Sequence, residues 1–315
     1  MAKKNAANVV GVKTKTTWKQ AFKRDWQLYL LLLLPLIMVF VFSYGAYPGL
    51  RMAFMDYKPA KGYAGSEWVG MKTFVKIFKD ADFMRALRNS IVFNLADLII
   101  GFPMPIILAL MLNEIRAGLY KKLSQTILYL PHFLSWVIIG GLVTTLFATT
   151  SGLINKGLTS IGLPAVPWLS DNGWWIFMYV FVTVWQGIGW GAIVYLSAIT
   201  GIDQEMYEAA KVDGCSRFKM MTKITLPSIR TTIVIMLILR VGGMMSIGFE
   251  KPQMLKNVMV NEVGDVISTF IYRYGIENNK FAISTAGGLL QSVINFALVM
   301  TANSLSRKIS DESIW

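Results

Sequence analysis

Residues 174–200, WWIFMYVFVTVWQGIGWGAIVYLSAIT, decide the fold, because they form an apolar run without a single charged residue. A bilayer core about 30 Å thick is crossed by about 20 mostly apolar helical residues, and this run is long enough. Hydrophobic residues make up 54% of the chain and charged residues only 16%, whereas about 25% of a typical soluble domain is charged. The sequence therefore predicts an all-α, polytopic membrane protein.

Further apolar stretches lie on both sides of this run. Together they predict six transmembrane helices, at residues 27–48, 90–113, 126–149, 174–200, 229–249 and 284–305. Residues 1–26 are then a basic amino-terminal tail, residues 27–305 a transmembrane domain and residues 306–315 a carboxyl-terminal tail. The first apolar stretch is too long for a signal-peptide core and lacks a small-residue cleavage site, so we expect an uncleaved first helix.

The net charge of +13 has a simple interpretation in a membrane protein. Lysines and arginines flank membrane helices and face anionic lipid, and no nucleic-acid recognition motif is present, so we expect no nucleic-acid partner. Cytoplasmic segments are usually the more basic ones. The tail before the first helix is rich in basic residues: Lys3, Lys4, Lys13, Lys15, Lys19, Lys23 and Arg24. Together with the even number of helices, this predicts that both termini are cytoplasmic.

Several kinds of chemistry are excluded by composition. The chain has one cysteine, Cys215, and one histidine, His132, whereas a metal site built from these residue types needs three or four ligands. No GxxxxGK[ST] motif is present, so the chain has no phosphate-binding loop of its own. We therefore expect no catalytic residue, no cofactor and no metal on this chain, and we interpret His132 as structural.

Residues 201–227, GIDQEMYEAAKVDGCSRFKMMTKITLP, separate the fourth and fifth predicted helices. Asp203 and Ser216 are good amino-terminal caps, so the segment predicts two short helices. Gly214 between them suits the left-handed position that ends a helix. Such a compact charged helix pair is either an ordinary surface connection or a docking element for another protein.

The pattern E-A-A, D-G and I-x-L-P in this segment resembles the signature loop of type I ATP-binding-cassette importer permeases. The matching residues are Glu208, Ala209, Ala210, Asp213, Gly214, Ile224, Leu226 and Pro227. Stretches across nearly the whole chain resemble the carbohydrate-uptake branch, most closely the LplB-type polysaccharide and oligosaccharide permeases. These stretches are WQLYLLLLLPL (26–36), FPMPIILALMLNE (102–114), YLPHFLSW (129–136), WQGIGWGAIVYLSAITGID (185–203), GFEK (248–251) and DVIST (265–269). Cys215 departs from the family, which more often has a small residue such as alanine there.

The resemblance implies a type I importer permease fold in a bacterial cell membrane. It implies that the loop is a cytoplasmic coupling helix seated in a cleft of a separate ATPase subunit, where Glu208 meets a basic residue and Gly214 provides the turn. A pair of ATPase subunits would bind ATP and Mg. A second permease, usually a different chain, and an extracellular solute-binding (lipo)protein complete the assembly, which imports an oligosaccharide by alternating access.

The fourth predicted helix carries a polar and aromatic face suited to a sugar. Its residues Thr183, Gln186, Gly187 and Trp190 lie at helical spacing, with Trp185 beside them. Aromatic faces and amides are the groups that position a polar ligand in an otherwise apolar pocket. The alternative is helix packing, because Gly187 and Gly191 form a GxxxG pair.

The fifth and sixth predicted helices add polar groups at membrane depth. A charge such as Arg240 at this depth costs about 2.5–3.5 kcal/mol, so it should face the interior and have a partner. That partner is either Asp97, the single acid of the predicted spans, or backbone carbonyls; alternatively, Arg240 meets an acidic sugar such as a uronate. Residues 291 and 295 are four apart and share a face. The pathway residues expected on these helices are Arg240, Gly243, Met244, Gln291 and Asn295.

Two other expectations stay open at this point. A stand-alone secondary transporter or channel is the alternative function, although such proteins often carry several intramembrane acids and this chain has only Asp97. Residues 68–87 are amphipathic and predict a short helix, which lies either at the outer membrane interface or packed on the protein surface.

Overall fold

The structure is a computed structural model that describes residues 18–116 and 118–310. Most of the two predicted tails, residues 1–17 and 311–315, therefore lies outside the described residues. The regular secondary structure of the described part is helical apart from one short antiparallel ribbon, in which β1 (Met55–Asp56) pairs with β2 (Glu67–Trp68). The expected all-α class is confirmed.

The chain divides into two units, residues 1–51 and residues 52–315. In the first unit, α1 (Trp18–Val39) continues into the π-helical turn η1 (Phe40–Tyr44). Pro35 is accommodated within α1, and apolar side chains along it are exposed. The predicted first span, residues 27–48, falls within a continuous apolar helical stretch, Phe22–Phe54. The observed stretch begins closer to the amino terminus than the predicted span.

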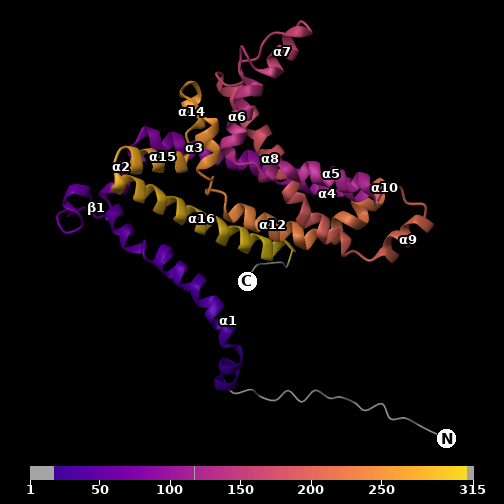
Figure 1. Ribbon diagram of the computed structural model, residues 1–315, viewed down its shortest axis with the longest axis horizontal. Helices are drawn as coiled ribbons and strands as arrows, with labels where there is room; N and C mark the ends of the chain where they lie inside the picture. Colours follow the sequence, from indigo (N-terminus) through magenta and orange to yellow (C-terminus); the bar gives the residue numbers. More distant parts are fainter. Residues whose placement is uncertain (1–17, 117, 311–315) are drawn as a thin grey trace. The chain divides into compact units, whose positions relative to one another are not determined.

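The second unit holds the remaining helices (Figure 1). Its α-helices are α2 (Lys72–Lys79), α3 (Ala81–Ala96), α4 (Pro103–Glu114), α5 (Leu119–Tyr129), α6 (Trp136–Phe147), α7 (Leu153–Ser160), α8 (Asn172–Thr200), α9 (Gln204–Val212), α10 (Arg217–Met220), α11 (Leu226–Ser228), α12 (Arg230–Gly242), α13 (Glu250–Leu255), α14 (Asn261–Gly264), α15 (Ile267–Tyr272) and α16 (Phe281–Ser310). Short 3₁₀ and π-helical turns are η2 (Tyr47–Phe54), which crosses the boundary between the units, η3 (Pro59–Lys61), η4 (Asp97–Gly101), η5 (Leu130–Phe133), η6 (Met221–Thr225), η7 (Val258–Val260) and η8 (Arg273–Glu277).

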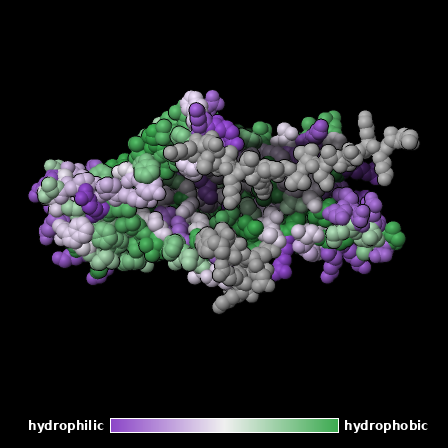
Figure 2. Space-filling model, turned by 90° about the horizontal axis from the view of Figure 1, so that it is seen from below, coloured by the Kyte–Doolittle hydropathy of each residue, from purple (hydrophilic) through white to green (hydrophobic). Residues whose placement is uncertain are grey.

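Four helices of the described chain are long and apolar enough to cross a bilayer, and six spans result if each of two bent helix pairs counts as one. The four are Phe22–Phe54, Ala81–Glu114, Asn172–Thr200 and Phe281–Ser304. Figure 2 shows broad areas of hydrophobic residues on one face, with hydrophilic residues gathered toward its ends. The prediction of six spans holds if each bent pair is counted as one span. The second span begins earlier than expected because Asp80 caps α3 at the backbone N–H groups of Asp82 and Phe83.

The third predicted span, residues 126–149, is not one straight helix. Its two halves, α5 with η5 and then α6, meet at an angle of 102°. Pro131 lies in η5, where its missing N–H and fixed ring end α5, and the break follows at residues 134–135, where Leu134 is extended. Ser135 then starts the new helix by accepting a hydrogen bond from the N–H of Ile138 at 3.4 Å. The apolar pattern alone could not separate a broken span from a continuous one.

The fifth predicted span, residues 229–249, is also interrupted. The helix α12 ends at Gly242, and the segment from 217 to 228 meets it at 62°. Beyond Gly243 the chain is not helical until α13. Irregular backbone is tolerated at membrane depth where it is buried in protein or lines a cavity, and the chain does line a cavity there.

The second unit is held together by three clusters of buried side chains. In one of them α4 packs along α8, with Ala109 and Ala192 fully buried. In another, Phe74 and Ile77 of α2 are buried against the region of α16 and α15. The amphipathic segment 68–87 is therefore not the single short helix expected: α2 is a short helix packed through Phe74 and Ile77, and residues 81–87 already belong to α3. Within this unit α9 and α10 lie at one end and α14 and α15 at the other, with α8 between them (Figure 1).

Candidate functional site

A cavity of about 930 Å³ lies between η4, α4, α8, α12 and the non-helical segment that follows α12. Seven of the predicted pathway residues line it: Thr183, Gln186, Gly187, Trp190, Arg240, Gly243 and Met244. The cavity is therefore built by the faces that the sequence indicated on the fourth and fifth helices. Its size lies in the range of 300–1,000 Å³ that is common for small-molecule sites.

The α8 face of the cavity is fixed by contacts with the break between α5 and α6. The Trp190 ring stacks on the His132 ring, with centroids 4.5 Å apart and planes 6° from parallel. One turn earlier, Gln186 Nε2 donates to the His132 carbonyl at 3.3 Å. His132, predicted to be structural, thus supports Trp190 and also lines the cavity.

The glycines of α8 divide between packing and the cavity. A Cβ on Gly189 would collide with the Leu128 carbonyl, and one on Gly191 would lie 2.9 Å from Pro105 Cγ. A Cβ on Gly187 would meet nothing within 4 Å. The close helix contact therefore runs through Gly189 and Gly191, and Gly187 of the GxxxG pair leaves room in the cavity instead.

Three predicted pathway residues lie outside the cavity lining. Trp185 is on another face of α8. Asn295 Oδ1 accepts from the Met245 N–H at 2.8 Å, and Gln291 Nε2 donates to the Met245 carbonyl at 2.5 Å. Asn295 Nδ2 also donates to Ser246 Oγ at 2.7 Å. The two amides of α16 therefore satisfy the unwound backbone after α12, which the periodic pattern gave no means of foreseeing.

Arg240 pairs with Asp97 on the cavity wall. Arg240 Nη2 contacts Asp97 Oδ2, and their side chains are 49% and 23% exposed. Asp97 begins the π-helical turn η4, and a Cβ on Gly101 at its end would clash with the Asp97 carboxylate. The expected partnership is therefore the one that forms, and Gly101 makes room for it. Such π-turns are frequent at functional sites.

Two further cavity residues were missed by sequence reasoning, Glu250 and Lys251 at the start of α13. They lie just beyond the fifth predicted span, which ends at residue 249. The Lys251 Nζ atom lies 5.0 Å from the centre of the Tyr179 ring and 5.9 Å from that of Trp136. Because the predicted fifth helix ends at residue 249, nothing in the sequence indicated that the residues after it come back to line the cavity.

The predicted coupling loop folds as two capped helices. Asp203 Oδ1 accepts from the Glu205 N–H at 3.0 Å and starts α9, and Ser216 Oγ accepts from the Lys219 N–H at 3.3 Å and starts α10. Gly214 between them has φ +73°. The turn therefore uses the left-handed backbone conformation that glycine adopts without a steric cost.

The surface of this loop combines charge with exposed apolar groups. Glu208, Ala209, Asp213, Gly214, Leu226 and Pro227 are exposed, Ile224 is half-buried and Ala210 is buried. Apolar side chains nearby are also open, with Val212 89% exposed and Phe218 69% exposed. This is a rigid surface with apolar side chains that lack cover in the described chain. It is suited to a partner, as expected for a docking helix.

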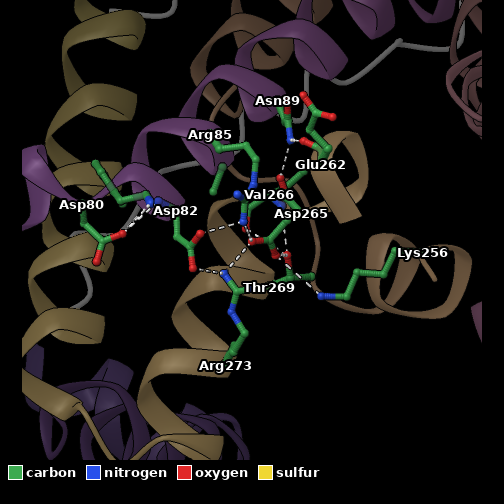
Figure 3. A network of polar contacts seen from close by, with 12 residues as sticks. Asp80, Asp82, Arg85, Asn89, Lys256, Glu262, Asp265, Val266, Thr269 and Arg273 are labelled. Carbon is green, nitrogen blue, oxygen red and sulfur yellow. Dashed lines mark hydrogen bonds and ion pairs between the residues drawn. The ribbon is translucent and has the colours of Figure 1, made fainter. Parts of the chain in front are cut away.

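A second polar cluster surrounds the buried carboxylate of Asp265 at the opposite end of the unit (Figure 3). Asp265 accepts from Arg273 Nη2 at 2.7 Å and from Thr269 Oγ1 at 2.7 Å, and Lys256 Nζ lies 3.6 Å away. Asn89 Nδ2 donates to the Asp265 carbonyl at 2.9 Å. The cluster ties α15 and the segment after α13 to α3, far from the coupling loop.

Burial and neighbouring charges shift the pKa values of two ionisable groups in this region. Burial lowers the pKa of Lys256, and the carboxylate of Asp265 opposes that change. Burial, and then the neighbouring Asp80, raise the pKa of Tyr274 to about 12. Tyr274 is therefore neutral near neutral pH. Among the described residues, no group of three or more His, Cys, Asp and Glu side chains could hold a metal ion.

Comparisons with known proteins agree with this architecture. Residues 101–311 match the family model described as binding-protein-dependent transport system inner membrane component. Protein LplB of Bacillus subtilis is 41% identical over 99% of this chain and 98% of its own length. The polygalacturonan/rhamnogalacturonan transport system permease protein YteP of the same organism is 41% identical over 91% of this chain and 90% of its own length.

Solved structures give the same result. A crystal structure of a bacterial ABC transporter involved in the import of the acidic polysaccharide alginate has a chain that matches with a TM-score of 0.84 at 41% identity. The match covers 93% of this chain and 99% of that one. A crystal structure of a bacterial alginate ABC transporter in complex with an alginate pentasaccharide-bound periplasmic protein matches with the same TM-score at 40% identity, covering 94% and 99%.

The family match covers more than half of the chain, and the relatives cover nearly all of it. The fold is that of a type I ABC importer permease. The chain belongs to the family of binding-protein-dependent transport system inner membrane components, and it is an integral membrane transport subunit of the ABC permease type rather than an enzyme.

Proposed function

We propose that this chain is the permease subunit of a bacterial ABC importer for oligosaccharides or polysaccharide fragments. The observation that carries the proposal is the cavity, whose wall offers the Trp190 ring and the Gln186 amide beside the Arg240–Asp97 pair. A flat ring together with hydrogen-bonding groups suits a sugar ring. Relatives that transport polygalacturonan, rhamnogalacturonan and alginate support the same substrate class.

The free energy for import is supplied by other subunits and not by this chain. A separate pair of ATPase subunits binds ATP and Mg, and the coupling loop of each permease sits in the cleft of one of these subunits. Glu208 and Asp213 are exposed and supply charge to that contact, and Val212 and Phe218 supply apolar area. A second, homologous permease chain completes the pathway, and an extracellular solute-binding (lipo)protein delivers the sugar.

The proposed location is the bacterial cell membrane, with the coupling loop and both termini in the cytoplasm. The basic tail that precedes α1 supports this orientation, because basic segments are retained on the cytoplasmic side. The coupling loop and the Asp265 cluster lie at opposite ends of the second unit (Figure 1). The Asp265 cluster is then on the outer side, where the binding protein arrives.

Uncoupling variants test the proposal. Glu208→Lys reverses an exposed charge on α9, and Gly214→Pro forces a fixed negative φ on a residue that has φ +73°. In the reconstituted importer we expect both to reduce sugar import while the membrane part still assembles. The matched control is Glu67→Lys, which reverses an exposed charge on β2. Normal import in both loop variants, or import by this chain alone in liposomes with an ion gradient, would refute the proposal.

A further inference from the structure

Two cations line the cavity, and their surroundings differ. Arg240 contacts the carboxylate of Asp97, so its charge is largely neutralised. Within the described part of the chain, no carboxylate lies within 4 Å of Lys251 Nζ. Glu250 is its neighbour in the sequence and lines the same cavity, but it too lies beyond that distance. Lys251 is therefore the cavity cation without a carboxylate in direct contact, although Asp97 lines the same wall.

The lysine is held by aromatic rings instead of by an acid. Its Nζ lies 5.0 Å from the centre of the Tyr179 ring and 5.9 Å from the centre of the Trp136 ring. A cation within about 6 Å of an aromatic face is attracted by the ring quadrupole. Because the rings accept no proton and carry no net charge, the ammonium keeps its hydrogen-bonding capacity for an anion.

Tyr179 provides a second observation at the same place. The ring is buried, and in the described structure its hydroxyl is a buried group without a hydrogen-bond partner. The polar residues Asp97, Tyr179, Thr183 and Lys251 line a small recess of about 10 Å³ in this wall, where Asp97 is paired with Arg240. Buried hydroxyls are normally paired. A donor without a partner next to an unpaired ammonium is the arrangement that an incoming anion satisfies.

We infer that Lys251 binds the carboxylate of an acidic sugar unit, such as a uronic acid, as the oligosaccharide passes through the cavity. The inference rests on the proposed function and assigns to Lys251, not to Arg240, the recognition of acidic units. A carboxylate gains both a hydrogen bond and an ion pair from the ammonium, whereas a neutral sugar unit gains the hydrogen bond alone. Lys251 is thus a specificity-determining residue of the cavity.

Import by the assembled transporter tests the inference. The complete importer, with its ATPases, second permease and binding protein, is reconstituted in proteoliposomes and supplied with labelled trigalacturonate or its carboxyl-reduced, neutral counterpart. We expect Lys251→Gln to reduce import of the acidic trimer about tenfold more than import of the neutral one, as the loss of a hydrogen bond to a charged group implies. Lys251→Arg should retain the preference. Because the binding protein is the same for every variant, its own selectivity cancels in comparisons with the wild type.

The controls separate recognition from assembly. Lys76→Gln removes an equal charge from the exposed face of α2, outside the cavity, and should leave the preference intact. A preference unchanged in Lys251→Gln, or lost equally in Lys251→Arg, would overturn the inference while leaving the proposed function in place. If the wild type imports neither trimer, the proposed function fails and the inference with it.

Discussion

The hydroxyl of Tyr207 and Thr225 Oγ1 lie 2.8 Å apart, so a side-chain hydrogen bond joins α9 to the π-helical turn that leads into α11 and α12. Thr225 is buried, and Ala210 beside this contact is buried as well. The two arms of the coupling loop are thus connected through side chains as well as through the turn at Gly214. A displacement of α9 by a partner would be passed to α12, which carries Arg240 on the cavity wall.

Loss of that bond should weaken coupling without removing it. Tyr207→Phe deletes one hydrogen bond, which contributes about 0.5–1.5 kcal/mol. We expect more ATP to be hydrolysed for each sugar imported, measured as the ratio of the two rates in proteoliposomes. Tyr120→Phe is the matched control, because Tyr120 is an exposed tyrosine on α5. An unchanged ratio in Tyr207→Phe would show that the contact does not transmit movement.

Substitutions at Gly214 should disturb the loop to a degree that depends only on how readily each residue adopts a positive φ. A Cβ there would meet no atom within 4 Å, but φ is +73°. Left-handed backbone costs an ordinary L-residue about 1–2 kcal/mol, and asparagine tolerates it better. We expect loop order to fall in the sequence glycine, asparagine, alanine and valine, measured by limited proteolysis of the loop in the purified protein. Equal proteolysis of the wild type and the three variants would contradict the strained turn.

The stability losses caused by substitutions in the Asp97–Arg240 pair should be non-additive. Arg240 is about half exposed to the cavity, so the pair should stabilise the fold by an amount between the roughly 1 kcal/mol of a surface pair and the about 3–5 kcal/mol lost when a buried pair is broken. We expect Asp97→Asn and Arg240→Gln each to lower the midpoint of thermal unfolding in detergent. The double variant should lose less than the sum of the two. Additive losses would mean that the contact contributes nothing to stability.

The buried carboxylate of Asp265 should matter more to stability than its exposed neighbour Asp82. Asp265→Asn removes the anion that Lys256 contacts and leaves Arg273 with Asp82 alone, in a site where Asp265 is 0% exposed. Removal of one partner from a buried ionic network costs about 3–5 kcal/mol. Asp82→Asn, at a side chain that is 38% exposed, should cost less. Chemical unfolding of both variants in detergent tests the order, and a larger loss for Asp82→Asn would reverse the assignment.

Much of the membrane architecture could be predicted from sequence, because long apolar runs and helix caps are local signals. The span at α8, the caps at Asp203 and Ser216 and the turn at Gly214 follow from residues that are close in the chain. The bend at Pro131 has a local cause, but its angle of 102° depends on packing against α8. Hydropathy cannot distinguish one span from two helices at an angle.

The cavity residues could be predicted where they lie on one face of a helix. They could not be predicted where the backbone is not helical. Gln291 and Asn295 have the polarity expected of pathway residues, yet they hold the Met245 backbone. Their role depends on α12 ending at Gly242, which is a tertiary fact. Lys251 escaped notice for the same reason, since only the unwound segment returns α13 to the wall.

The claim on which the account depends is that residues 203–227 face the cytoplasm and are gripped by a separate ATPase. Cys215 tests it most directly, because it is the chain's single cysteine and lies exposed in that loop. The measurement is labelling by a membrane-impermeant maleimide in sealed vesicles of either orientation. We expect labelling from the cytoplasmic side only, and protection of Cys215 when the ATPase subunits are bound. Labelling from the outer side, or equal labelling with and without the ATPase, would contradict the account.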